Sequence, residues 1–220
     1  MINWLHAVTH RPEQGWDPVP AEHAVHYAQG QWEVLDEAPL QELEDWLGGF
    51  AGKDVLDLGG GPGQFTVAMA RRGARVTWHD VSANYREIVR ARNPGYAIRD
   101  SLGYLEDAIR LGESAFDLVF NRICFNYSRS DRHFVQMIWK LLKPGGVGYV
   151  DTNNALFHFD ELALGARLRT WLNTGTGWKI GHPFPPHGRL ARLVLALPTE
   201  RVVVDYSRAT NDRIIFRKAR

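Results

Sequence analysis

Strand-like and helix-like stretches alternate along the middle of the chain. Strands are predicted at five short runs, which span 54–58, 75–80, 96–100, 115–121 and 147–152. Helices are predicted between them, over 63–73, 82–92, 103–110 and 130–142. Alternation with such short connections indicates a parallel sheet that is covered by helices on both faces.

The last part of the chain has a different pattern. A helix predicted at 188–197 is followed by two β-rich runs at 201–206 and 213–216, and only the six residues SRATND separate these runs. Strands joined by so short a segment pair antiparallel, because a parallel connection needs a longer crossover. The expected fold class is therefore α/β: a doubly wound, mostly parallel, seven-stranded sheet with an antiparallel C-terminal hairpin.

Two segments lie outside this alternation. Residues 1–49 contain an irregular lead-in up to about residue 20 and helices predicted at 21–29 and 38–48, and we expect them to form an N-terminal lid. Residues 50–220 are expected to form the main domain. Within it, residues 153–187 are rich in glycine, proline and aromatic side chains and are predicted to be an insertion on the substrate side.

Composition narrows the possible partners. The 220 residues include 26 Lys and Arg and 25 Asp and Glu, so the net charge of +1 does not favour nucleic acid or an anionic membrane. No apolar run approaches the roughly 18–20 residues that span a bilayer. With Cys124 as its single cysteine, the chain cannot form an internal disulfide or a cysteine-bound metal site. We expect a cytoplasmic protein without a metal, and the sequence does not indicate an oligomeric state.

A glycine-rich turn, "VLDLGGGPGQF", joins the first predicted strand to the next helix. It contains Gly59, Gly60, Gly61 and Gly63. Turns of this kind let a cofactor rest on bare backbone beside the N–H groups of a helix start. A dinucleotide site would place a third glycine at Gln64, and the carboxylate of Asp57 would repel a pyrophosphate. An NAD(P)-dependent oxidoreductase is therefore the alternative, and a cationic cofactor suits Asp57 better.

The ordered set of motifs resembles the class I S-adenosylmethionine-dependent methyltransferases over roughly residues 50–152 and 188–218. "DLGGGPG" is similar to the first motif of that family, D-x-G-x-G-x-G, and "LLKPGG" to its turn before the fifth strand. The resemblance implies a Rossmann-like methyltransferase fold and S-adenosyl-L-methionine as cofactor. It also implies the cofactor-binding residues: Asp80 for the ribose hydroxyls with Val81 beside it, Asp100 for adenine with Ser101 and Leu102, and Asn121 near the reacting centre.

The acceptor side is predicted from polar residues that follow strands four and five, where open parallel sheets bind ligands. His158 is the candidate catalytic base, with Asn126 and Tyr127 as acceptor positioners, although structural roles fit all three equally well. Asp151 and Asn154 lie in the same region. In the N-terminal helices, Tyr27 is the candidate lid residue over the methionine end of the cofactor.

These features predict a methyltransferase that acts on a small, partly apolar molecule by O- or N-methylation. Aromatic residues in the lead-in and the insertion favour such an acceptor, while a peptide or a carboxylate also stays compatible with the neutral surface. The segment "NRICFNY" lacks the Asn/Asp-Pro-Pro-aromatic sequence of amino-methylating DNA enzymes, so a nucleic acid is not expected. A further alternative is a non-catalytic subunit that binds the cofactor and braces a catalytic partner.

Overall fold

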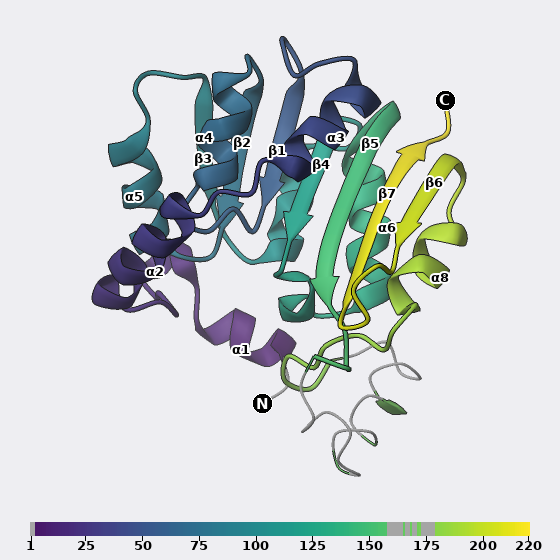
Figure 1. Cartoon of the computed structure of the whole chain (residues 1–220). Coiled ribbons are helices and arrows are strands. Elements are labelled where there is room, and N and C mark those ends of the chain that lie inside the picture. The colour runs from purple at the N-terminus through teal and green to yellow at the C-terminus, as the bar shows by residue number, and fades with distance from the viewer. Residues whose placement is uncertain (1–2, 158–164, 166–167, 169–170, 173–178) are drawn as a thin grey trace.

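One seven-stranded sheet forms the centre of the molecule in the computed structural model, which describes residues 3–157, 165, 168, 171–172 and 179–220 (Figure 1). The strand order is β3-β2-β1-β4-β5-β7-β6. The strands are β1 Asp54–Leu58, β2 Arg75–Asp80, β3 Ile98–Leu102, β4 Phe116–Arg122, β5 Leu142–Asn153, β6 Thr199–Asp205 and β7 Asn211–Lys218.

Helices connect most of the strands and precede the first one. The α-helices are α1 Asn3–Thr9, α2 Ala21–Glu33, α3 Ala38–Leu47, α4 Gln64–Arg71, α5 Ala83–Arg92, α6 Asp131–Leu141 and α8 Arg189–Leu195. The 3-10 helices are η1 Pro12–Gln14, η2 Leu105–Leu111 and η3 Phe125–Tyr127. Across the described part of the chain, every helix is too short or too polar to serve as a membrane span.

The strand directions confirm the predicted fold class. Strands β1 to β5 pair in parallel, whereas β7 pairs antiparallel with both β5 and β6. The order changes direction at β1, because β2 and β3 lie on one side of it and β4 on the other. At such a switch point the connections leave towards opposite faces, and ligands bind at the carboxyl ends of the strands.

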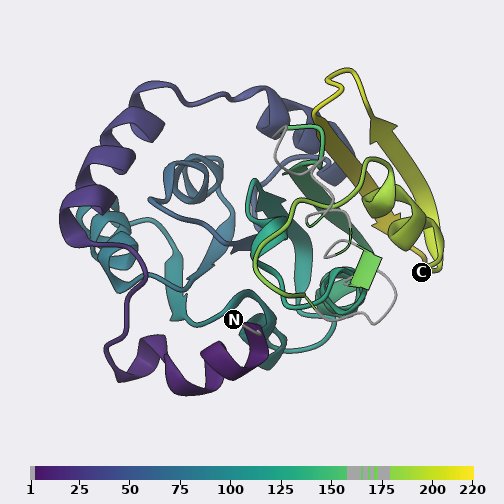
Figure 2. The same cartoon turned by 90° about the horizontal axis from the view of Figure 1, so that it is seen from below.

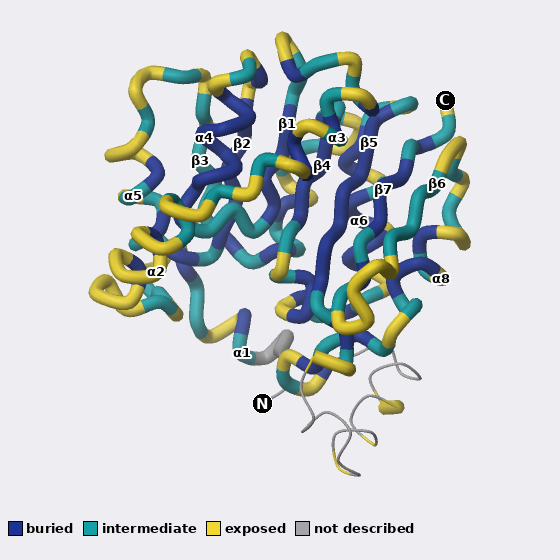
Figure 3. The backbone as a smooth tube through the Cα atoms, in the orientation of Figure 1, coloured by how far each residue is buried: buried dark blue, intermediate teal, exposed yellow. Residues whose placement is uncertain are grey.

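Apolar side chains on the two faces of the sheet form separate cores. One core joins the sheet to η2, α6 and α8 and includes Leu56, Phe134 and Phe216; the other joins it to α3 and α4 and includes Leu43, Met69 and Tyr149. Neighbouring residues of one strand enter opposite cores, as the period of two in a strand requires. The central strands are accordingly buried along their length, while much of α2 is exposed (Figure 3).

Several boundaries differ from the prediction, and three of the differences lie near the ends of the sheet or before it. Residues 3–9 form α1 instead of an irregular lead-in. β3 begins at Ile98, two residues later than predicted, because the side chain of Asn93 accepts hydrogen bonds from the backbone of Gly95 and Tyr96 and extends the preceding turn. The segment expected to turn before the fifth strand belongs to β5, which begins at Leu142 and contains an irregularity opposite Phe116–Leu118.

The carboxyl ends of the parallel strands meet at one edge of the sheet, which Figure 2 shows from below. Helix α1 lies below this edge in Figure 1 and to one side of the strand ends in Figure 2, and residues 179–188 return to the edge from the predicted insertion. His158 lies outside the described residues. The predicted cofactor-binding and acceptor-binding residues should therefore lie at this edge.

Candidate cofactor site and acceptor side

The side chain of Asp57 is buried on β1 directly before the glycine-rich turn. Only 3% of the residue is exposed, and its Oδ2 accepts a hydrogen bond of 2.5 Å from the hydroxyl of Thr66 on α4. Burial raises the pKa of Asp57 to about 7, and the Thr66 bond opposes the rise only in part. A buried carboxyl group with one hydroxyl partner favours a cation nearby.

The glycines of the turn serve different purposes. A Cβ on Gly59 would lie 2.2 Å from Sγ of Cys124, and one on Gly60 would lie 2.4 Å from the indole of Trp78. Gly63 leaves room for Val89 of α5, so its role is close packing of two helices. A Cβ on Gly61 would instead project into open space. Of these four positions, Gly61 is thus the one where a missing side chain leaves room for a ligand on the backbone.

Asp80 holds the turn from the end of β2. Its Oδ2 accepts a hydrogen bond of 2.9 Å from the backbone N–H of Gly61, and its Oδ1 accepts one of 3.0 Å from the N–H of Ser82. The N–H of Val81 binds the same carboxylate. Burial raises the pKa of Asp80, and these three amides oppose the rise. Since a carboxylate has about four acceptor positions, two ribose hydroxyls would bind only if an amide such as that of Gly61 moved away.

Asp57 and Asp80 create a negative environment in the interior. The charge of Asp80 contributes to the raised pKa of Asp57, so the two carboxylates interact across the turn. Buried carboxylates are usually compensated by a cation or by strong hydrogen bonds. A ligand that combines a sulfonium and an ammonium with a nucleoside fits this donor set, because the cation would face Asp57 while the ribose hydroxyls would reach Asp80.

Side chains predicted to bind adenine form hydrogen bonds with other residues of the protein. Asp100 lies inside β3 instead of after its end, and its two oxygens accept hydrogen bonds of 3.2 and 3.1 Å from the guanidinium of Arg90. Ser101 contacts His79 on β2 through its hydroxyl. Leu102 ends β3. Two of the three side chains that the resemblance gives to adenine are therefore already engaged within the protein.

Asn121 lies buried near the end of β4, beside the glycine-rich turn. Its Nδ2 donates to the carbonyl of Leu58 at 2.8 Å and to Sγ of Cys124 at 2.9 Å. Its Oδ1 is buried and has no hydrogen-bond partner among the described residues. Unpaired buried carbonyl groups are costly, so this oxygen points to a donor or a polarised group that the bound cofactor would supply.

Helix α2 covers the glycine-rich turn from outside. The indole N–H of Trp32 donates to the carbonyl of Pro62 at 3.0 Å, and Gln64 donates to Gln31 at 3.2 Å. Tyr27 on the same helix is 41% exposed, and its pKa is raised by burial, then by the phenol of Tyr127, with a smaller effect from Asp80. Tyr27 therefore lies within electrostatic reach of both Tyr127 and Asp80, and its ring centroid is 6.1 Å from that of Tyr85 on α5.

The turn that follows β4 carries the two acceptor candidates. Ile123 in this turn has φ of +64°, an unfavourable conformation for a β-branched residue. Asn126 is buried, and its Oδ1 has no hydrogen-bond partner in the described part of the chain. Tyr127 is 57% exposed, and its ring centroid lies 5.0 Å from that of His182.

His182 is not among the predicted residues, because it lies in an irregular segment far from any predicted strand end. Its imidazole forms a hydrogen bond with the backbone of Asn126, and burial lowers its pKa, as does the nearby Lys179. The lowered pKa favours the neutral imidazole, which is the form that can accept a proton. A single sequence contains no signal for His182, since only the fold brings this residue beside Tyr127.

A buried lysine holds this turn from behind. Lys179 is 4% exposed, and its Nζ lies 2.6 Å from Asp131 Oδ1 and 3.0 Å from the hydroxyl of Ser128. It also donates to the carbonyls of Phe125 and Asn126, at 3.3 and 3.4 Å. Residues of the predicted insertion thus fix the backbone on which the acceptor candidates lie.

Two other polar residues near strand five have structural partners. Asp151 accepts from Arg122 at 3.2 Å and from Asn211 at 2.7 Å. Asn154 donates to the buried Asp212 at 2.8 Å. These contacts join β5 to β4 and β7, so neither side chain is directed by the structure to an acceptor. Within the described residues, no cluster of three or more His, Cys, Asp or Glu side chains could hold a metal ion.

A glycine-rich turn at the switch point, two buried carboxylates at the ends of β1 and β2, and an antiparallel β7 between β5 and β6 define a class I S-adenosylmethionine-dependent methyltransferase domain. Comparison with known families agrees, because residues 56–150 match the family described as a methyltransferase domain. The match covers slightly less than half of the chain, in the part that carries β1 to β5. S-adenosyl-L-methionine is the methyl donor of the class, which confirms the family and cofactor that the motifs predicted.

Curated relatives include enzymes with different acceptors. A ubiquinone biosynthesis O-methyltransferase from Chelativorans sp. (strain BNC1) is 34% identical over 131 residues, which cover 58% of this chain and 51% of that protein. A tRNA 5-carboxymethoxyuridine methyltransferase from Escherichia coli (strain K12) is 30% identical over 97 residues, which cover 42% and 37%. The chain thus spans about half or less of the length of these relatives.

Solved structures share the fold at low sequence identity. The phosphoethanolamine N-methyltransferase 2 of Haemonchus contortus superposes with a TM-score of 0.67 at 13% identity, over 91% of this chain and 58% of that one. An S-adenosylmethionine-dependent methyltransferase from Mesorhizobium loti gives 0.62 at 19% identity, over 85% and 100%. These similarities establish the fold and leave the acceptor to the chemistry of the site.

Proposed function

We propose that this protein transfers the methyl group of S-adenosyl-L-methionine to an oxygen or nitrogen atom of a small, partly apolar molecule. The observation that carries the proposal is the buried side chain of Asn126, whose Oδ1 lacks a partner within the described residues. An acceptor with an O–H or N–H group would satisfy this oxygen. The exposed ring of Tyr127 on the same turn would pack against an apolar or planar part of that acceptor.

Residues of the first strands would hold the cofactor, which when bound supplies a methyl group on a positively charged sulfur. Asp57 offers a buried carboxylate for the cationic end, and Asp80 offers oxygens for the ribose. Gly61 leaves space above the backbone, and Asn121 presents its unpaired carbonyl. Orientation of this kind contributes to rate because the reacting groups are already aligned.

His182 is the base that we propose for an acceptor that loses a proton. Its neutral imidazole lies beside Tyr127, and its hydrogen bond to the backbone of Asn126 fixes the ring. A base is useful for a hydroxyl acceptor, whose proton must leave as the new bond forms, whereas an amine can react without one. His158, the base predicted from sequence, stays a prediction.

A small molecule is preferred over a macromolecule as acceptor. The relatives named above are described as a ubiquinone biosynthesis O-methyltransferase and a tRNA 5-carboxymethoxyuridine methyltransferase, so relatives alone do not decide the acceptor class. The near-zero net charge of this chain does not favour a polyanion. Its single cysteine is free, in keeping with the reducing cytoplasm, where we place the reaction.

The test follows the fate of a labelled methyl group. The purified chain is incubated with methyl-labelled S-adenosylmethionine and, separately, with the small-molecule, RNA and protein fractions of a cell extract. Label in the small-molecule fraction alone is the expected result. Label in RNA or protein alone would contradict the proposed acceptor class, and cofactor binding without transfer to any fraction would indicate the non-catalytic subunit.

Matched variants keep the assay specific to the proposed residues. Asp80→Ala should abolish labelling together with cofactor binding. Asn126→Ala and His182→Gln should reduce labelling by about ten- to hundredfold while they leave cofactor affinity unchanged. If both acceptor-side variants transfer as well as the wild type, the acceptor does not bind at this turn.

A further inference from the structure

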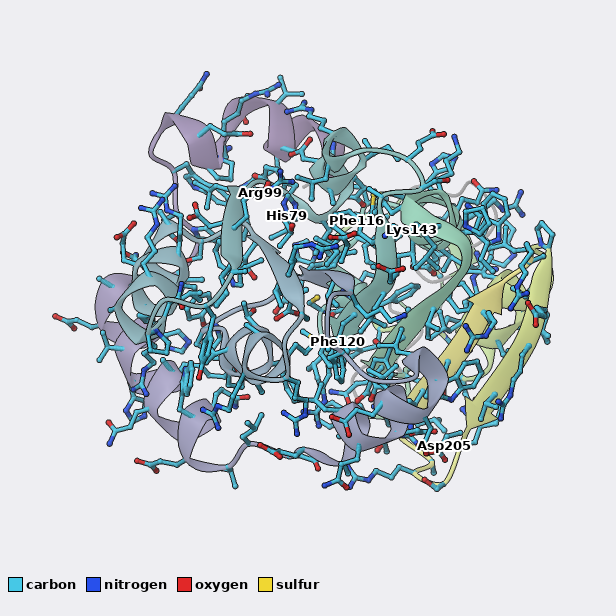
Figure 4. All side chains as sticks on the ribbon, turned by 90° about the horizontal axis from the view of Figure 1, so that it is seen from above. His79, Arg99, Phe116, Phe120, Lys143 and Asp205 are labelled. Carbon is cyan, nitrogen blue, oxygen red and sulfur yellow. The ribbon has the colours of Figure 1, made fainter. Side chains whose placement is uncertain are left out.

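The imidazole of His79 joins β2 to the turn after β3. His79 is 1% exposed and lies inside the molecule, in contrast to Asp205 at the periphery (Figure 4). One ring nitrogen, Nε2, lies 2.8 Å from the carbonyl oxygen of Tyr104, and Nδ1 lies 3.0 Å from the hydroxyl oxygen of Ser101. A carbonyl only accepts, so Nε2 carries the proton and Nδ1 accepts from Ser101.

The same imidazole also packs against the turn. A Cβ on Gly103 would lie 3.3 Å from Cε1 of His79, so glycine at this position lets the backbone approach the ring. The N–H of Gly103 donates to the carbonyl of Asp80 at 2.9 Å. In addition to the pairing of β2 with β3, three hydrogen bonds therefore tie residues 101–104 to β2, directly beside the carboxylate proposed to bind ribose.

Tyr104 is held on its other side as well. Its backbone N–H donates to Asp107 at 3.1 Å, and its hydroxyl donates to the carbonyl of His10 at 2.6 Å. Its ring stacks on Trp16 with centroids 6.0 Å apart. The turn after β3 thus has a defined position between β2 and the N-terminal segment, and the side chain of His79 joins it to β2 by hydrogen bonds at both ring nitrogens.

A nucleoside whose ribose lies at Asp80 must place its base near a neighbouring strand end. β3 is the neighbour of β2 on the outer side of the sheet. Arg90 holds both oxygens of Asp100, and His79 holds the hydroxyl of Ser101. Neither side chain offers a ready group to the base, so the backbone and Leu102 form the surface that a base would meet.

We propose that His79 is a positioning residue for the cofactor: it fixes residues 101–104 as a wall against which the nucleobase packs. The base is then recognised by shape and by main-chain groups, and the carboxylate of Asp100 takes no part. This inference rests on the proposed function, since it concerns the same cofactor, and it adds a residue and a mode of recognition to that site.

The experiment measures affinities for two probes by calorimetry. S-adenosylhomocysteine contains the nucleoside and the amino-acid end, whereas 5′-methylthioadenosine contains only the nucleoside end. His79→Leu should weaken both probes by the same factor, about tenfold or more, and Ser101→Ala should weaken both about threefold to fivefold. Asp100→Ala should change neither by more than about twofold. Asp57→Asn is the control for the amino-acid end of the ligand, and it should lower the affinity for S-adenosylhomocysteine but not the affinity for 5′-methylthioadenosine.

Two outcomes would overturn the proposal. One is a folded His79→Leu variant that binds methylthioadenosine with wild-type affinity, and the other is an affinity of Asp100→Ala for either probe that is tenfold or more below the wild-type value. If His79→Leu does not fold, the affinities of Ser101→Ala and Asp100→Ala for the two probes test the proposal instead. The proposal requires that Ser101→Ala loses more affinity than Asp100→Ala. If the wild type binds neither probe, the cofactor assignment itself fails. That failure is distinguishable from a failure of the present proposal, which would be seen only in the variants.

Discussion

At the scale of single residues, Asp57 gives the site a pH dependence. Its pKa is raised to about 7 in the folded protein, mainly by burial. A carboxyl whose folded pKa exceeds its unfolded value keeps a proton that the unfolded chain loses, so between about pH 4 and pH 7 stability falls as pH rises. Above pH 7 the carboxylate is charged in both states, and this contribution no longer changes.

The affinity for S-adenosylmethionine should change in the opposite direction. A cation binds the ionised carboxylate, and the ionised fraction of a group with pKa about 7 rises about tenfold between pH 6 and pH 8. We expect the association constant to rise by about that factor. Calorimetry at both pH values checks this, with Asp57→Asn as the control that should bind weakly and without the pH trend. A wild-type affinity that is constant over this range would contradict the role of Asp57.

Gly59 should tolerate substitution much less than a glycine with a similar backbone elsewhere. Gly59 has φ of +75° and no room for a Cβ, while Gly52 has φ of +72° and no atom within 4 Å of the added Cβ. Gly52→Ala should lower the free energy of unfolding by about 1 kcal/mol, from backbone strain alone. Gly59→Ala should cost about 3 kcal/mol, since a steric clash with Cys124 adds to the strain.

Urea denaturation of the two variants measures the difference. The double variant Gly59→Ala/Cys124→Ala should recover part of the lost stability, because it removes the sulfur and leaves the backbone strain. Equal losses in Gly59→Ala and Gly52→Ala would show that the contact between the turn and Cys124 relaxes without cost.

Residue order along the chain predicted the acidic residues of the site but not all of their partners. Asp57 and Asp80 could be identified because each ends a buried run beside a turn. Whether a side chain lies at the end of a strand depends on where the strand begins and ends, and β3 runs from Ile98 to Leu102, so Asp100 lies within it and contacts Arg90. His182 could not be found at all, since its neighbours come from distant parts of the chain.

At the scale of elements, Lys179 links the predicted insertion to η3 and α6. The ammonium is buried, 11% of the Asp131 side chain is exposed, and Arg189 lies 3.5 Å from the other oxygen of that carboxylate. Lys179→Met should destabilise the protein by about 3 kcal/mol, because it leaves a largely buried carboxylate with one partner fewer. Lys143→Met is the matched control: this lysine bridges Asp54 and Asp117 in a half-buried setting, so its loss should cost about 1 kcal/mol or less.

Chemical denaturation of the two lysine variants tests this ranking. Asp131→Asn added to Lys179→Met should restore part of the stability by removing the uncompensated charge. If Lys179→Met unfolds at the same urea concentration as Lys143→Met, the buried network contributes little and η3 is held by its other contacts.

Most strands and helices of the main domain could be predicted, because periodicity and turn residues agree there. The order of the strands could not be derived from pattern, and the antiparallel end was suggested only by the short connection before β7. Helix α1 escaped prediction because a seven-residue helix has too few turns to show an apolar face. Elements with weak local signals depend on contacts that appear only in the folded chain.

At the scale of the whole molecule, cofactor binding should raise the temperature of unfolding. A ligand at 100 times its dissociation constant stabilises a protein by about 2.7 kcal/mol. For a domain of this size that corresponds to a shift of about 5–11 °C. S-adenosylhomocysteine should produce the shift in a thermal scan, whereas NAD should not. A shift with NAD alone would favour the oxidoreductase alternative, and Asp80→Ala should remove the response to S-adenosylhomocysteine.

The place of β7 between β5 and β6 has a consequence for synthesis on the ribosome. Residues 142–153 and 199–205 emerge first, yet the strand that joins them comes later, at 211–218. Until then the nascent chain exposes one long, unpaired edge of β5, which is open to pairing with other chains. Ribosome-bound chains that have exposed only residues up to 205 should be digested rapidly by protease, and those that have also exposed residue 218 should resist it.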